Sequence, residues 1–207
     1  MSDPGGTLGR MDDKAMLHQY LRENRDSLLA KLDGLSEYDA RRPLTATGTN
    51  VAGLVKHVAS VQLDYFGEVF DRPHGRALPW LADDAEPNAD LWVPADESLD
   101  SVRELHAFSA AHADATITEL PLDARGRVPW WRPESADVTL HRILVHMVAE
   151  TARHAGHADI VRETVDGAVG TRPDDPNLPF HDDGTWAAYR ARVEDAARTA
   201  SAAGAAG

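Results

Sequence analysis

Four polar side chains recur at helical spacing between residues 140 and 163. His146, Glu150 and His154 follow one another at four-residue intervals, and His157 comes three residues later. Side chains at these intervals lie on one face of a helix, with Cβ atoms roughly 5–6 Å apart. Imidazole nitrogens and a carboxylate at that separation can bind a divalent metal ion. The stretch therefore predicts a metal site on one helix, and the spacing alone leaves open which of the four residues are ligands.

The same stripe could also form without a metal. Histidine and glutamate are mostly exposed, so the stripe could be a solvated face. Ile143, Met147 and Val161 belong to the same stripe, however, which predicts that it faces inward. Buried titratable groups without partners cost free energy, and either a metal ion or a hydrogen-bonded network would offset that cost. The zinc-protease motif HExxH is excluded, because Met147 follows His146.

Composition narrows the possible functions. The chain has 207 residues, no cysteine and a formal net charge of −13. Without cysteine, a metal can be bound only by His, Asp or Glu, and any thiol chemistry needs a thiol from outside. The negative charge argues against a nucleic acid or an anionic membrane as partner. Neither an 18-residue apolar run nor a secretory signal is visible, so a cytoplasmic location is expected.

Apolar periodicity predicts four long helices that would position these side chains. Asn50, Ser98 and Thr139 are good N-cap residues, and Gly167 suits a helix end. The predicted helices span about 12–35, 50–70, 98–120 and 139–167, and a short final helix spans 186–200. The connection 71–97 is rich in proline and acidic residues. Its length is typical of a functional lid or a crossover.

The absence of a convincing set of strands predicts an all-α four-helix bundle. Short links join the first helix to the second and the third to the fourth. The long connection allows the second and third helices to run parallel, which gives an up-down-down-up order. We expect a single domain over residues 11–198, a disordered tail at 1–10 and a flexible tail at 199–207.

His57 is the histidine of the second predicted helix, and it lies between apolar residues at helical spacing, Leu54 and Val61. From its surroundings it could be a core residue or a ligand. If the second and fourth helices are antiparallel, His57 and His154 lie at similar depth in the bundle, so a shared site is possible. His106 and His112 are six residues apart and do not share a face, so we expect surface or packing roles for both.

Two strings resemble the DinB-like family of metal-binding bundle proteins. They are NVAGLVKHVASVQLDYFGEVF, and VPWW followed by VTLHRILVHMVAETARHAGHADIVRETVDGAVG. The second string is similar to the actinobacterial branch with mycothiol-dependent enzymes. The resemblance covers residues 12–195 and is most specific in residues 138–170.

The resemblance implies an up-down-down-up bundle with one divalent metal, usually zinc or nickel, on three side chains. The matching positions here are His57, Glu150 and His154. His146 and His157 do not match ligand positions, and the resemblance implies that they line the pocket or orient the ligands. Related members bind the thiolate of a small thiol, mycothiol or bacillithiol.

The expected function is therefore a mycothiol-dependent thiol S-transferase, or a thiol-assisted isomerase, acting on a small electrophile as a monomer or homodimer. Two alternatives remain open at the level of sequence. One is a metal-dependent hydrolase that uses metal-bound water. The other is a non-catalytic stress protein that binds a metal or a small molecule.

Overall fold

The computed structural model describes residues 12–171, 178–180 and 182–204. By its internal contacts the chain divides into two compact units, Met1–Val169 and Gly170–Gly207. No helix in the described part of the chain is both long and apolar enough to cross a membrane. The first unit contains the residues that the sequence singles out, so the site is built there.

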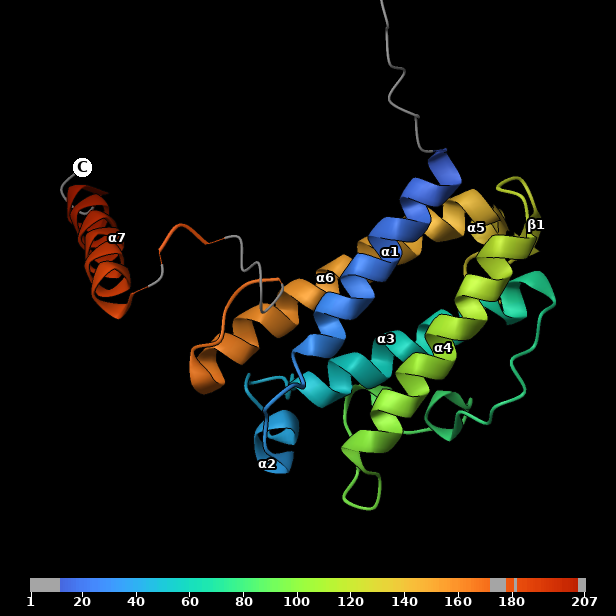
Figure 1. The fold of residues 1–207 in the computed structure, drawn as a ribbon, viewed down its shortest axis with the longest axis horizontal. Coiled ribbons are helices and arrows are strands. Elements are labelled where there is room, and N and C mark those ends of the chain that lie inside the picture. The colour runs from blue at the N-terminus through green and yellow to red at the C-terminus, as the bar shows by residue number, and fades with distance from the viewer. Residues whose placement is uncertain (1–11, 172–177, 181, 205–207) are drawn as a thin grey trace, which may run out of the picture. The chain divides into compact units, whose positions relative to one another are not determined.

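Four long helices form the first unit, and they are α1 (Asp13–Ala30), α3 (Val51–Phe66), α4 (Leu99–Glu119) and α6 (Leu140–Asp166). Helix α3 packs against α4 and α6, and α1 packs against α6 and α4. In Figure 1, α1 and α6 run in one direction while α3 and α4 run in the other. The predicted all-α, up-down-down-up bundle is confirmed.

Side-chain caps fix where these helices begin. The side chains of Asp12, Asn50, Ser98 and Thr139 each accept a hydrogen bond from a backbone N–H three residues later. Such bonds satisfy donors that have no partner within the helix. Gly167 ends α6 in the left-handed conformation, with φ of 76°. The helix starts and the helix end predicted from cap residues are thus confirmed.

Two helices are shorter than predicted. Helix α1 ends at Ala30, and residues 31–34 form a turn that closes on Gly34, with φ of 75°. Helix α3 ends at Phe66, because the backbone of Gly67 is not helical. The chain continues as the 3-10 turn η1 (Glu68–Phe70). A short helix, α2 (Glu37–Arg41), lies in the link between α1 and α3, where the sequence predicts no helix.

A small hairpin near one end of the bundle was not predicted. Strand β1 (Arg125–Arg127) pairs antiparallel with β2 (Asp137–Thr139), and the short helix α5 (Pro133–Ala136) lies between them. Three-residue strands are too short to show a two-residue period in the sequence. Val128 and Val138 of this region are buried in the core. The hairpin therefore covers the end of the core from which α6 starts.

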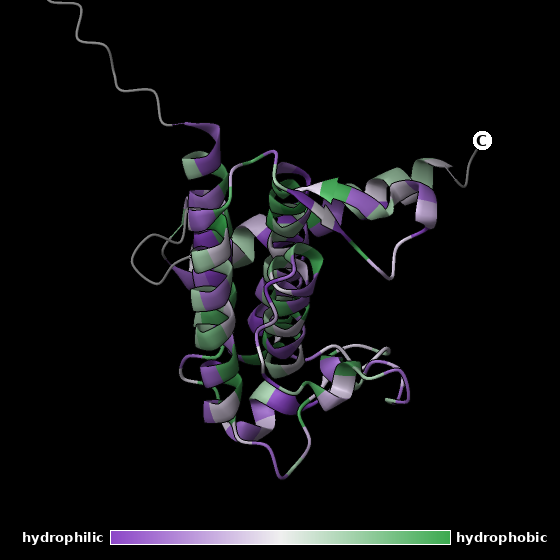
Figure 2. Cartoon of the chain, turned by 90° about the vertical axis from the view of Figure 1, so that its right-hand side faces the viewer, coloured by the Kyte–Doolittle hydropathy of each residue, from purple (hydrophilic) through white to green (hydrophobic). Residues whose placement is uncertain are grey.

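Apolar side chains fill the inside of the bundle in two main clusters. Figure 2 shows hydrophobic and hydrophilic residues alternating along each bundle helix, as amphipathic packing requires. Ile143, Met147 and Val161 of α6 are all buried. The prediction that this stripe of α6 faces inward is correct for its apolar members.

The long connection between α3 and α4 contains the 3-10 turns η2 (Pro79–Leu81) and η3 (Ala89–Leu91). Turn η3 lies against the first turns of α3. Asn50 Nδ2 donates to the carbonyl of Leu91 at 3.1 Å. A Cβ atom at Gly53 would collide with that same carbonyl. A glycine at this position therefore lets the connection lie directly on α3.

The second unit contains helix α7 (Asp183–Gly204), where the ring of Phe180 packs on Trp186 at 5.0 Å between centroids. The helix starts three residues earlier than expected and includes residues 199–204 of the predicted tail. The predicted tail at residues 1–10 and the last three residues lie outside the described part of the chain. A single domain over residues 11–198 stays a prediction.

Candidate metal centre

Three donor groups from two helices converge between α3 and α6. His57 is on α3, and Glu150 and His154 are one turn apart on α6. Glu150 Oε1 lies 3.0 Å from His154 Nε2 and 3.6 Å from His57 Nε2. One ligand atom from each residue lies within 4.8 Å of the other two. In the described residues this is the one cluster of His and acidic groups with metal-binding spacing.

His57 is held in place by a residue of the long connection. Asp90, in η3, lies with Oδ2 at 2.6 Å from His57 Nδ1. If Nδ1 carries the ring proton and donates it to Asp90, the lone pair of Nε2 points toward Glu150. A carboxylate behind a metal-binding histidine commonly fixes the tautomer in this way. The arrangement thus presents His57 Nε2 as a ligand atom.

The surroundings of the two imidazoles shift their pKa values in opposite directions. Burial by itself lowers the pKa of His57, but the hydrogen bonds and charges of Asp90 and Glu150 outweigh it and raise the pKa. Burial and the neighbouring His57 lower the pKa of His154. The pKa of Glu150 is also lowered, because the effects of His154 and His57 outweigh its burial. Without a metal, His57 is therefore the imidazole of the pair that binds a proton more readily.

The chemistry of the donor set fits a divalent cation. Two imidazoles and a carboxylate face one another, all three side chains are partly buried, and the carboxylate is ionised. Their side-chain exposures are 17% for His57, 29% for Glu150 and 14% for His154, so the centre remains reachable from solvent. Nitrogen and oxygen ligands in this combination suit zinc and related divalent metals.

The segment that contains this cluster matches a known protein family. A family model described as mycothiol-S-transferase matches residues 16–167, which include the bundle and all three residues of the cluster. The chain belongs to the mycothiol-S-transferase family. This match confirms the DinB-like resemblance of the sequence.

One solved structure supports the fold of this family member. It is described as the conserved protein of a locus from Enterococcus faecalis, and it matches with a TM-score of 0.54 and 19% sequence identity. The match covers 77% of this chain and 100% of the other. At that identity the similarity concerns the fold alone. Among proteins with curated descriptions, none matches the chain.

The other two histidines of the α6 stripe lie on either side of the cluster in this family member. The ring of His146 packs against Tyr65 and Trp131, with centroids 4.8 and 5.1 Å away. Both Trp130 Nε1 and Trp131 Nε1 lie within hydrogen-bond distance of Tyr65 Oη, at 3.3 and 3.0 Å. His146 therefore belongs to an aromatic cluster one turn before Glu150.

His157 is exposed, and its ring lies 5.4 Å from that of His154. It forms no part of the three-residue cluster. Away from the site, His106 is buried in α4 and burial lowers its pKa to about 4, which fits the expected packing role. His112 packs near His74 at 6.1 Å between ring centroids.

Asp90 is the residue of this site that sequence reasoning missed. The connection 71–97 contains several acidic residues, and nothing in their spacing separates Asp90 from the others. Its partner His57 is 33 positions away, so no helical or strand period links the two. The length of the connection predicted a functional lid or a crossover, and this expectation came closest to indicating a site residue there.

Proposed function

We propose that the protein is a metal-dependent mycothiol S-transferase that joins the thiol sulfur to a small electrophile. His57, Glu150 and His154 hold the metal, with zinc as the expected ion and nickel as the alternative. The observation that supports this most is the convergence of three donor groups within the segment matched by the mycothiol-S-transferase family. In the reaction the S–H bond breaks and a sulfur–carbon bond forms. The thiol proton goes to a base, and the electron pair displaced at the attacked carbon stays on the electrophile's leaving group or opened ring.

A bound divalent ion would lower the pKa of a coordinated thiol, so that the thiolate is available at neutral pH. Three protein ligands leave room for an exogenous one, which is typical of catalytic zinc sites. The chain contributes no thiol of its own. Its residues would therefore hold the ion, orient the co-substrate and accept the proton.

We assign the proton-accepting role to His146. Burial lowers the pKa of His146, so its imidazole is neutral at pH 7 and can accept a proton. It stands one turn from Glu150 on the same face of α6, and the aromatic contacts with Tyr65 and Trp131 fix its ring. His157 is more exposed and lies beside His154, where it could orient that ligand. The partner is a small molecule, the location cytoplasmic, and the protein a monomer or homodimer.

Metal content and thermal stability test the proposal. Protein purified without a His-tag should contain about one equivalent of divalent metal. Adding metal at about 100 times Kd should stabilise the fold by about 2.7 kcal/mol, or roughly 5–10 °C in Tm. His57→Ala and His154→Ala should abolish this shift, and His157→Ala should retain it. The proposal fails if no metal binds, or if His157→Ala loses the metal while Glu150→Ala keeps it.

Activity is tested by consumption of the thiol together with an electrophile. Conjugation of a panel of small electrophiles should require both mycothiol and metal. His146→Gln should keep the metal affinity but lower the rate roughly 10²-fold or more, the size of effect expected for a general base. Turnover of an ester or amide without any thiol would instead indicate a hydrolase.

A further inference from the structure

One face of α3 carries both a residue of the metal centre and a residue that lines a cavity. Leu54, His57, Val61 and Tyr65 are spaced three or four residues apart, so their side chains share that face. Tyr65 contacts His146 at one end, and His57 contacts Glu150 and His154 in the middle. Leu54, at the other end, lines a cavity of about 350 Å³.

The cavity and the metal centre also take residues from the same segment of the long connection. Asn88 and Leu91 line it, and these residues flank Asp90, the hydrogen-bond partner of His57. Leu54 precedes His57 by three residues, or about 4.5 Å along the helix axis. Asn50, which also lines the cavity, is about 10 Å from His57 along the same axis. A molecule bound at the metal through one end could therefore extend into the cavity.

The residues around this cavity are aromatic, polar or aliphatic, and none of them is charged. Trp92 is 47% exposed and is one of the residues that line the space. Thr49 contributes a hydroxyl and Asn88 an amide, and within the described part of the chain neither side chain is used in a hydrogen bond. A flat indole beside free hydroxyl and amide groups suits a neutral ligand with many hydroxyl groups.

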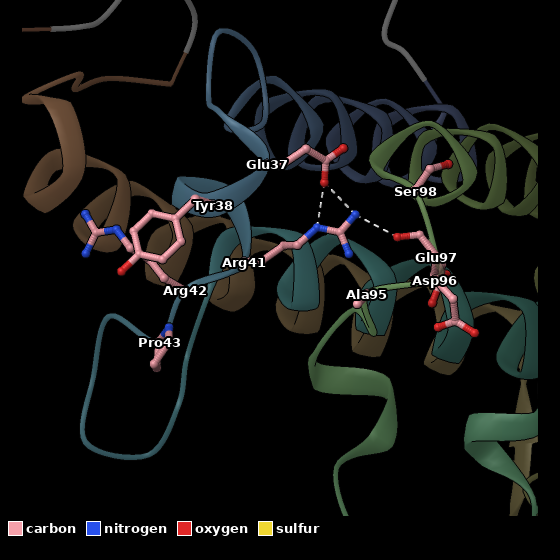
Figure 3. Close-up of a pocket in the computed structure, with 9 residues that line it drawn as sticks. All are labelled: Glu37, Tyr38, Arg41, Arg42, Pro43, Ala95, Asp96, Glu97 and Ser98. Carbon is pink, nitrogen blue, oxygen red and sulfur yellow. Dashed lines mark hydrogen bonds and ion pairs between the residues drawn. The ribbon is translucent and has the colours of Figure 1, made fainter.

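Two larger cavities have a different character. The one drawn in Figure 3, about 660 Å³, is lined by Glu37, Arg41 and Arg42, and Arg41 bridges Glu37 and the carbonyl of Glu97. The second, about 760 Å³, is lined by Lys56, Arg76 and Glu97 among others. Trp92 lines this cavity as well as the uncharged one, whereas Asn88 and Thr49 line the uncharged one alone. Lys56 follows Leu54 by two positions and so points to another face of α3. Both cavities therefore suit charged ligands and do not share the face of His57.

We propose that the uncharged cavity between Leu54, Asn88 and Trp92 binds the sugar–cyclitol half of the thiol co-substrate. This inference rests on the proposed function. In mycothiol, an N-acetylated cysteine is joined through an amide to an amino sugar that carries a cyclitol, and both rings are neutral and rich in hydroxyl groups. The sulfur is about 6 Å from the sugar ring along an extended chain. That length lies between the axial separations of Leu54 and Asn50 from His57, which are about 4.5 and about 10 Å.

In this arrangement the two substrates bind at opposite ends of the α3 face. The polyol lies at the Leu54 end, against Trp92. The electrophile then approaches from the Tyr65 end, near the proton acceptor His146. Specificity for mycothiol over a simpler thiol should depend on Trp92, Asn88 and Thr49, and not on the metal ligands.

Binding of a thiol-free fragment tests the cavity without any catalysis. The probe is N-acetylglucosaminyl-inositol, titrated into metal-loaded full-length protein by calorimetry. Trp92→Ala and Asn88→Gly should each raise its Kd at least fivefold. Glycine at residue 88 keeps the left-handed backbone, with φ of 64° at Asn88, while removing the amide. Thr49→Val removes a hydroxyl at similar size and serves as a third variant.

Tyr38→Ala is the matched control, because Tyr38 is an exposed aromatic residue of the charged cavity in Figure 3. It should leave the fragment Kd unchanged. All variants should bind metal as the unmodified protein does. The inference is overturned if the fragment does not bind at millimolar concentration, or if Trp92→Ala and Tyr38→Ala behave alike.

Kinetics separate this inference from the proposed function. Trp92→Ala should raise KM for mycothiol at least fivefold and leave KM for N-acetylcysteine unchanged. If thiol transfer occurs but Trp92→Ala leaves KM for mycothiol unchanged, the proposed function is supported and the proposed role of the cavity is contradicted. Fragment binding that depends on Trp92, in a protein with no thiol transfer, would sustain the cavity and contradict the function.

Discussion

Asp90 is the residue on which the orientation of His57 depends. Its carboxylate lies 2.6 Å from Nδ1, and both side chains are mostly buried, with exposures of 14% and 17%. His154 has no comparable partner, because its Nδ1 is buried without a hydrogen bond in the described part of the chain. The two imidazoles of the cluster are therefore held unequally, and His57 is the better oriented of the two.

Asp90→Asn should weaken metal binding about 10- to 100-fold, as is typical when the carboxylate behind a ligating histidine is lost. A competitive titration with a chromophoric chelator measures this directly. Asp84→Asn is the matched control, because it makes the same change at an exposed carboxylate of the same connection. Equal affinities for the two variants would show that Asp90 does not position His57.

At the residue scale, the sequence predicts part of the site. Helical spacing groups Glu150 and His154 with His146 and His157 on one face, and the family resemblance then selects Glu150 and His154 as ligands. His57 has no such signal, and family resemblance was needed to choose between a core residue and a ligand. Asp90 was inaccessible to both approaches, since its contact depends on how a 3-10 turn lies on a distant helix.

At the scale of elements, contact between η3 and α3 depends on the absence of a side chain at Gly53. Any Cβ there would collide with the carbonyl of Leu91. Asn50 adds a hydrogen bond to that carbonyl, and Arg41 donates to the carbonyls of Pro94 and Glu97 further along. The connection is thus fixed to α2 and α3 on both sides of Trp92.

Gly53→Ala should displace η3 and with it Asp90. We expect a loss of about 1–3 kcal/mol in the free energy of unfolding, as in other overpacked sites, together with weaker metal binding. Gly156→Ala is the control, because a Cβ at Gly156 of α6 meets no neighbouring atom. That change should stabilise the protein by about 0.5–1 kcal/mol through helix propensity. Chemical denaturation with and without metal compares the two, and a stable, metal-binding Gly53→Ala protein would contradict the prediction.

Elements were predictable where a cap or a long period marks them. The caps at Asn50, Ser98 and Thr139 gave three helix starts, because such side chains replace missing backbone partners. The ends of α1 and α3 were overestimated, since the apolar period continues past both true ends. The hairpin and α2 were missed because three to five residues contain too little periodicity to identify.

At the scale of the whole molecule, one half-buried carboxylate outside the metal centre makes stability depend on pH. Burial and the neighbouring Glu68 raise the pKa of Asp64 from 3.8 to about 6. His74 is nearby, with Nε2 at 3.8 Å from Asp64, but burial lowers the pKa of His74, so it is neutral near pH 7. Among the residues that the structure describes, the ionised form of Asp64 therefore lacks a cationic partner.

The direction in which stability changes with pH follows from proton linkage. Below the unfolded-state pKa of 3.8, Asp64 is protonated in both states and has no effect. Between 3.8 and about 6 the folded protein binds the proton more tightly, so stability falls as pH rises. Above this range Asp64 is ionised in both states, so the folded state carries the whole free-energy cost of that charge. Solvent screening limits this cost to about 1–2 kcal/mol.

Asp64→Asn should therefore raise Tm by about 2–6 °C at pH 7.5 and by much less at pH 4. Differential scanning calorimetry at both pH values checks this. Asp84→Asn should change Tm little at either pH, because Asp84 is exposed. An equal increase in Tm for Asp64→Asn at both pH values would show that ionisation is not the cause.

Because Glu150 is a carboxylate, the proposed ligand set carries one negative charge. A divalent cation, this carboxylate and a bound thiolate then sum to no net charge. A site with three imidazoles and the same thiolate would retain one positive charge. Net charge in a partly buried site costs free energy, and a less positive centre withdraws less electron density from sulfur. Glutamate at position 150 therefore favours a neutral complex whose sulfur keeps more of its nucleophilic character.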